Sequence, residues 1–172
     1  MKNDFVFPIL SLSLICFVMV AALALVNNMT FSIIEEAAYY RATQAMRSII
    51  PQADEFTQIE SDNLPAAVAA AYRTMNDTGL IFIIRTRGFG GEMLTMHGIC
   101  PAGNFLGSSV LAHNETISFA NRVFDIRDAY EARGQSLMDV DAITGATRTF
   151  HAYQDAIRYA LEAFDVLRRG GQ

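Results

Sequence analysis

The fold of this chain is decided by the stretch Asp141-Ala142-Ile143-Thr144-Gly145-Ala146-Thr147, with Arg148 and Thr149 directly behind it. Gly145 can take turn conformations closed to other residues, and Ala146 adds little bulk. We expect Thr147 at the N-cap of a helix, beside backbone N–H groups that have no helical partner. Such a helix start favours an anion, and a phosphate is the first candidate. Taken alone, these residues are also explained by an ordinary capped helix that follows a turn.

The segment after Thr147 has the periodicity of an amphipathic helix. Its apolar positions repeat at three- and four-residue steps and are Phe150, Tyr153, Ile157, Ala160, Leu161, Phe164 and Leu167. Arg168 and Arg169 suit the negative end of a helix, and Gly170-Gly171 is typical of a helix stop. We expect this stripe to dock on a sheet and to hold the Thr147 turn in place.

The sheet is predicted from residues 56–113. Strands are expected at 80–84, Glu92–Ile99 and Phe105–His113, where apolar runs are bounded by turn sequences. Phe56–Ile59 is a further short candidate, and the alanine-rich stretch 67–75 fits either a helix or a strand. Asn76-Asp77-Thr78-Gly79 predicts the turn that ends it.

The first 51 residues predict a membrane anchor and a stalk helix. Residues 5–26 carry no charge, and at 1.5 Å per residue about 22 residues span about 33 Å, enough for a hydrocarbon core of about 30 Å. A cleaved signal peptide is the alternative, because Ala22-Leu23-Ala24 resembles a cleavage site. We expect a retained anchor, since the apolar run exceeds a typical signal core. Residues 31–50 continue at helical spacing until Pro51.

Charge bears on orientation and on partners. Lys2 precedes the apolar run and Glu35 and Glu36 follow it, which favours a cytoplasmic N-terminus and an exported body. The formal net charge of −5 does not indicate nucleic-acid binding. Cys16 and Cys100 form no CxxC pattern, and the spacing of the three histidines predicts no metal site.

The stretch from Asp141 to Thr147 resembles the flavinylation motif Asp-x-x-Ser/Thr-Gly-Ala-Thr of the FMN-binding domain family. That family includes the G subunit of Rnf electron-transport complexes and the C subunit of sodium-translocating NADH:quinone reductases. The resemblance implies that a flavin transferase attaches FMN through a phosphoester to Thr147 and needs Asp141. It also places Thr144, Gly145, Ala146 and Arg148 at the cofactor.

Two upstream segments resemble the same family. Gly88-Phe89-Gly90-Gly91 is similar to its Gly-aromatic-x-Gly corner, and His113-Asn114-Glu115-Thr116 to its His-x-Glu-Thr. The family continues with Pro-Gly-x-Gly near the flavin ring, whereas this chain has Ile117-Ser118-Phe119-Ala120. Glu115 and Thr116 are therefore expected at the cofactor. Phe119 is a candidate for stacking on the flavin, with a core position as the alternative.

These inferences predict an α+β protein with an N-terminal transmembrane helix, an antiparallel-sheet FMN-binding domain and a packed C-terminal helix. We divide it into an anchor (1–30), a stalk helix (31–51) and the flavin domain (52–172). No catalytic site of its own is predicted, because the sequence lacks a phosphate-binding loop, a Ser-His-Asp order or a paired-carboxylate motif. The chemistry is expected from the FMN.

The resemblance implies an electron-transfer subunit in the cell membrane, with its flavin outside the cytoplasm. Its expected partners are the other membrane subunits of a redox-driven, ion-translocating complex, the flavin transferase and the lipid bilayer. Two alternatives stay open: a stand-alone extracytoplasmic flavoprotein carrier, and a membrane-anchored assembly module without flavin. The sequence does not identify the complex, the electron donor or acceptor, or the ion.

Overall fold

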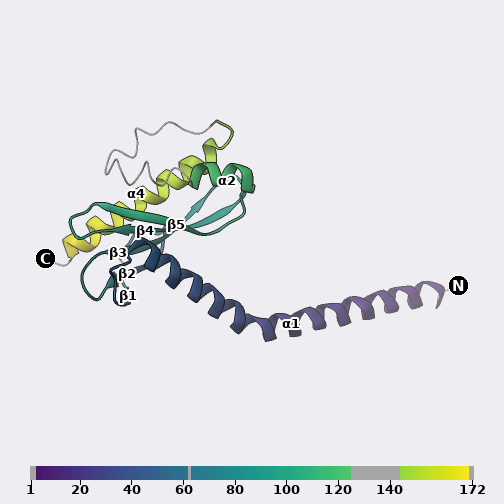
Figure 1. Cartoon of the computed structure of the whole chain (residues 1–172). Coiled ribbons are helices and arrows are strands. Elements are labelled where there is room, and N and C mark those ends of the chain that lie inside the picture. The colour runs from purple at the N-terminus through teal and green to yellow at the C-terminus, as the bar shows by residue number, and fades with distance from the viewer. Residues whose placement is uncertain (1–2, 62, 125–143, 171–172) are drawn as a thin grey trace. The chain divides into compact units, whose positions relative to one another are not determined.

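The computed structural model describes residues 3–61, 63–124 and 144–170, and it contains one sheet flanked by helices. Figure 1 shows the elements along the chain. In chain order they are α1 (Asn3–Ile49), β1 (Phe56–Ile59), β2 (Val68–Thr74), β3 (Leu80–Arg87), β4 (Glu92–Ile99), β5 (Phe105–His113), α2 (Ile117–Phe124) and α4 (Thr147–Gly170). The predicted α+β class, with a sheet followed by a packed C-terminal helix, is confirmed.

The five strands form an antiparallel meander in the order β1-β2-β3-β4-β5. The bounds of β1, β4 and β5 are those predicted, and the ambiguous stretch 67–75 forms β2. β3 extends to Arg87, three residues beyond the predicted end, and pairs with β4 as far as Arg87 opposite Glu92. The corner at 88–91 therefore joins β3 directly to β4, and these two strands pair along their full lengths.

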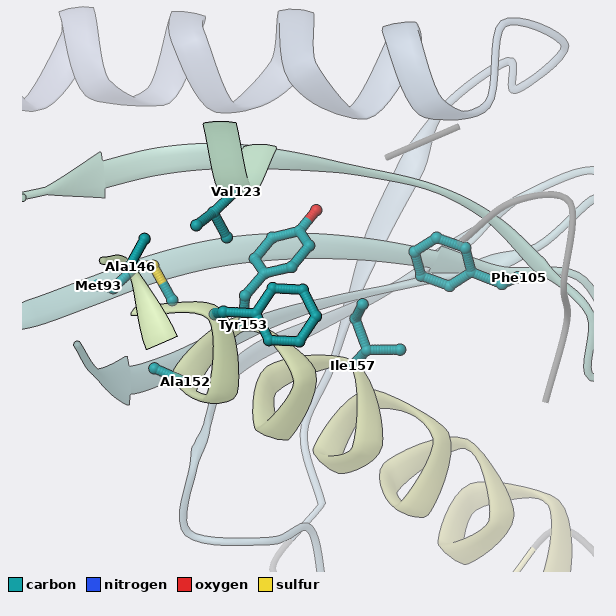
Figure 2. Packing of buried hydrophobic residues seen from close by; sticks show 8 residues of the cluster. Met93, Phe105, Val123, Ala146, Ala152, Tyr153 and Ile157 are labelled. Carbon is teal, nitrogen blue, oxygen red and sulfur yellow. The ribbon is translucent and has the colours of Figure 1, made fainter. Parts of the chain in front are cut away.

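α4 covers one face of the sheet (Figure 1). Its apolar stripe is buried: Phe150, Tyr153 and Ile157 are each 1% exposed or less. Figure 2 shows the Tyr153 and Ile157 side chains projecting from the helix towards the strands, and they share one buried cluster with Met93 and Phe105 from the sheet. Burying a large apolar side chain contributes about 1.5–3 kcal/mol, so this stripe fixes α4, and with it the turn before Thr147.

The opposite face of the sheet is covered by the last residues of α1 and by Ile50, which directly follows the helix. Met46, Ile49 and Ile50 are buried against Ile81 and Met96. These three residues lie in the compact unit Ala42–Gln172, which also contains the whole sheet. The part of α1 after Arg41 is therefore a layer of the folded domain.

The other compact unit, Met1–Arg41, consists of the long apolar part of α1. Residues Val6–Phe31 are long and apolar enough to cross a membrane, with a mean hydropathy of 2.9 and none of that segment buried within the chain. A signal sequence has the same character, so the helix is a candidate anchor by length and composition. Pro8 lies near its start, where a missing N–H costs little.

One helix, α2, was not predicted from the sequence. Residues 117–120, which replace the family's Pro-Gly-x-Gly, form the first turn of α2. The segment contains neither proline nor glycine, so nothing in it breaks a helix. α2 ends against the core, where Val123 is fully buried and the Phe124 ring lies 5.2 Å from that of His113.

Candidate functional site

A cavity of about 210 Å³ lies where three segments of the chain meet. The segments are the β3–β4 corner, the residues after β5, and the start of α4. The lining residues are Phe89, Glu115, Thr116, Gly145, Ala146, Arg148 and Thr149. Because these residues are up to 60 positions apart in sequence, the fold and not local sequence assembles this site.

The start of α4 forms one wall of the cavity. Gly145 has a φ of 87°, which permits the sharp turn into the helix. The first helical hydrogen bond runs from the Phe150 N–H to the Ala146 carbonyl, 2.9 Å away. Ala146 is therefore the N-cap and Thr147 the first helical residue, so the prediction of Thr147 as N-cap was wrong by one position. The turn at Gly145 brings the chain into the helix one residue earlier than expected.

Glu115 lies between the β3–β4 corner and the start of α4. It is 8% exposed, and its Oε1 accepts a hydrogen bond from the Gly90 N–H at 2.9 Å. Its Oε2 accepts one from the Thr149 hydroxyl at 2.7 Å. The carboxylate thus binds two parts of its own chain, and its role is to join them.

The electrostatics of the wall suit a phosphate. The first N–H groups of a helix have no helical partners and carry the positive end of the helix dipole. The exposed Arg148 side chain adds a full positive charge on the lining, and guanidinium pairs readily with phosphate oxygens. Thr147, at the same helix end, is exposed to solvent.

Phe89 gives the cavity an apolar side. Its ring is 75% exposed at the corner between β3 and β4. A large aromatic side chain left in solvent beside a polar helix start fits a planar ligand with an anionic tail. Together these residues fit FMN, whose phosphate matches the helix start and Arg148 and whose ring matches Phe89.

The cavity is small for a cofactor held without a bond. Small-molecule sites usually enclose about 300–1,000 Å³, against about 210 Å³ here. A site of this size encloses only part of a ligand as large as FMN. Covalent attachment would retain the remainder.

Five of the predicted site residues meet at this cavity: Glu115, Thr116, Gly145, Ala146 and Arg148. Thr144 and Thr147 are exposed in the adjoining turn and helix start. Asp141 lies outside the described residues, as does the side chain of Phe119, so their predicted roles stay predictions. The assignment of these residues to the cofactor is likewise a prediction that geometry supports.

Sequence reasoning missed Phe89 and Thr149 as lining residues. Phe89 had a signal, because it is the aromatic residue of the Gly88-Phe89-Gly90-Gly91 corner. Thr149 had none, since a threonine in the first turn of a helix is ordinary. Its importance becomes visible only through the long-range hydrogen bond to Glu115.

A second, larger cavity of about 380 Å³ lies by the last turns of α4, between Arg73, Leu80, Phe164 and Arg168. None of the predicted site residues lines it. At 1.5 Å per residue, Phe164 is about 25 Å along the helix from Thr147. The smaller cavity is therefore the candidate site.

The chain matches a known protein family over this region. Residues 88–162 match the family model of the FMN-binding domain. The match runs from the β3–β4 corner into α4 and so contains every lining residue of the smaller cavity. This match confirms the predicted resemblance to the FMN-binding domain family, and that family implies FMN as the cofactor.

Two relatives carry the same name, that of the G subunit of an ion-translocating oxidoreductase complex. The protein from Stutzerimonas stutzeri is 30% identical over 122 residues, which cover 66% of this chain and 54% of that protein. The chain thus spans about half the length of that relative. The protein from Shewanella piezotolerans (strain WP3 / JCM 13877) is 25% identical over an alignment of 198 residues, covering 96% of this chain and 92% of that protein.

Proposed function

We propose that this chain is a membrane-anchored electron-transfer subunit that carries FMN covalently on Thr147. Its place is in a redox-driven, ion-translocating complex, as the name of its two relatives suggests. The observation that carries the proposal is the convergence of Gly145 and Ala146, the motif residues next to Thr147, with Phe89 and Arg148 on one cavity at the start of α4. Bound FMN would supply one- and two-electron transfer.

The role of the protein is attachment and orientation. Attachment joins Thr147 Oγ1 to the flavin phosphate, and the hydroxyl proton leaves. With a flavin dinucleotide as donor, the bond between its two phosphates breaks and a nucleoside monophosphate departs. The chain then gains FMN less one water. Arg148 and the helix start would hold the phosphate charge, while Phe89 would offer an apolar surface to the ring.

Intact-mass measurement of the full chain made together with a flavin transferase tests this proposal. The wild-type protein and Thr147→Ser, which keeps a hydroxyl, should gain FMN less one water. Thr147→Ala should stay unmodified, with a melting temperature close to that of the wild type, because an exposed substitution usually changes stability by less than about 0.5 kcal/mol. Thr57→Ala, an exposed threonine on β1, is the control and should be fully modified.

An unmodified wild-type chain would refute covalent attachment and favour the flavin-free assembly module. If Thr147→Ala is still modified, the FMN is attached to another residue. Purification from the native membrane distinguishes a subunit of a complex from a stand-alone carrier. Several multi-span subunits should co-purify with the chain, whereas a stand-alone carrier would purify alone.

The proposed location is the cell membrane, with the flavin domain outside the cytoplasm. It rests on the apolar segment Val6–Phe31 and on the charges that flank it. Glu162 is exposed on α4, so Glu162→Cys, in a chain with Cys16 and Cys100 replaced by alanine, reports the side of the membrane. An impermeant thiol reagent should label it in whole cells. Labelling only after lysis would contradict export.

A further inference from the structure

The Glu115 carboxylate joins three segments that are distant in sequence. One oxygen binds the Gly90 N–H in the β3–β4 corner, and the other binds the Thr149 hydroxyl in the first turn of α4. Glu115 itself follows β5, and its own N–H donates to His113 Nδ1 at 3.2 Å. A single buried side chain therefore links the corner to the first turn of the helix.

The corner is shaped to accept this carboxylate at close range. A Cβ atom on Gly88 would lie 2.1 Å from Glu115 Oε1, and a Cβ on Gly90 would lie 2.1 Å from the Asn114 carbonyl oxygen. Both distances are far below any normal contact, so a larger residue at position 88 would displace the Glu115 carboxylate, and one at position 90 would push the corner away from the Asn114 backbone. The two glycines and the carboxylate form one tightly fitted contact.

Thr149 holds the first turn of α4 at the same contact, in the rotation that the buried stripe of the helix also favours. It is 2% exposed and points to Glu115. Successive residues turn by about 100° in an α-helix, so Thr147 lies about 200° round the axis from Thr149. Thr147 is accordingly exposed. As long as Thr149 is held inward, Thr147 faces outward, next in sequence to the lining residues Ala146 and Arg148.

We propose that Thr149 and Glu115 are positioning residues for flavin attachment, which hold Thr147 outward and keep the Phe89 corner beside it. The inference rests on the proposed function. Neither residue supplies the atom that is modified. They act through the first turn of α4 and through the corner, and their loss should leave the threonine present but poorly presented.

Thr149→Val tests this, because it keeps the shape of the side chain and removes the hydroxyl. In the full chain, with flavin transferase and flavin dinucleotide, the initial rate of flavin attachment should fall about tenfold, a factor expected for one hydrogen bond to a charged group. Thr149→Ser restores the hydroxyl and should stay within about twofold of the wild type. Intact mass against time measures both.

Thr95→Val is the matched control for loss of stability. Thr95 is also buried, and its hydroxyl lies 2.8 Å from His97 Nε2, away from the cavity. It should lower the melting temperature as Thr149→Val does and yet be modified at the wild-type rate. Amide hydrogen exchange at 147–150 in the unmodified proteins gives a second readout, and it should rise in Thr149→Val only.

The outcomes separate the two proposals. An unmodified wild-type chain would refute the proposed function and this inference with it. If the wild type is modified and Thr149→Val shows the wild-type rate of attachment and the wild-type amide exchange, the inference alone is refuted. An equal slowing of attachment in Thr95→Val would also refute it. If Thr149→Val does not fold, Glu115→Gln replaces it. The amide turns one acceptor into a donor, so attachment should again slow, and a wild-type rate would refute the inference.

Discussion

His97 is a buried histidine that shapes how stability depends on pH. Its ring contacts the Phe105 and Tyr153 rings, and Nε2 lies 2.8 Å from Thr95 Oγ1. Nδ1 has no hydrogen-bond partner among the described residues. A neutral ring with its proton on Nε2 fits this environment, since it donates to Thr95 and leaves only a bare lone pair in the core. Burial lowers the pKa of His97 from 6.5 to about 3.

The unfolded chain therefore binds a proton at His97 more readily than the folded one. Stability from this residue is fully present above about pH 6.5 and is lost as the pH falls towards about 3, with an upper limit of about 5 kcal/mol over that window. Urea unfolding at several pH values should show His97→Gln with a shallower loss of unfolding free energy than the wild type. His151→Gln, an exposed histidine, should match the wild type, and equal slopes in all three proteins would contradict this account.

Among the elements, the β3–β4 corner makes the strictest demands on its residues. Gly90 has no room for a Cβ, because the obstacle is the Asn114 backbone carbonyl and not a flexible side chain. Gly90→Ala should lower the free energy of unfolding by about 1–3 kcal/mol, the usual range for overpacking. Gly170→Ala meets no atom within 4 Å and should be neutral. Chemical denaturation measures both, and a neutral Gly90→Ala would show that the corner relaxes freely.

Elements with strong local patterns were predictable from the sequence. β4 and β5 were predicted to the residue, because β-branched and apolar runs end there at glycine- and proline-containing turns. α2 was missed, because residues 117–120 were compared with the family's Pro-Gly-x-Gly and their own helix-compatible composition was not considered. The N-cap was misplaced by one residue, since the φ of 87° at Gly145 is a property of the folded turn.

The site was predictable only in part for a related reason. A motif names residues that are neighbours in sequence, and Gly145, Ala146 and Arg148 were found in this way. The bond between Thr149 and Glu115 joins residues 34 positions apart, and the one between Gly90 and Glu115 joins residues 25 positions apart. No local spacing encodes either bond. They follow from the sheet order and from the docking of α4.

In the chain as a whole, α1 belongs to two compact units, with the boundary after Arg41. Among the described residues up to Arg41, no side chain is buried, and the apolar segment Val6–Phe31 needs an apolar environment such as a lipid bilayer. From Ala42 onward it belongs to the domain with the sheet. The predicted functional division at 51–52 stays a prediction, and the folding unit begins part of the way through the proposed stalk.

Two truncations separate these boundaries. A chain that starts at Ala42 keeps Met46, Ile49 and Ile50, which cover Ile81 and Met96 on the sheet. It should be soluble, cooperative in unfolding and open to flavin attachment. A chain that starts at Gln52 loses three buried side chains, each contributing about 1.5–3 kcal/mol, out of a total stability of about 5–15 kcal/mol for a typical domain. It should unfold at much lower temperature or aggregate through the uncovered face. Calorimetry of the two chains tests this, and equal melting temperatures would show that the end of α1 only rests on the sheet without stabilising it.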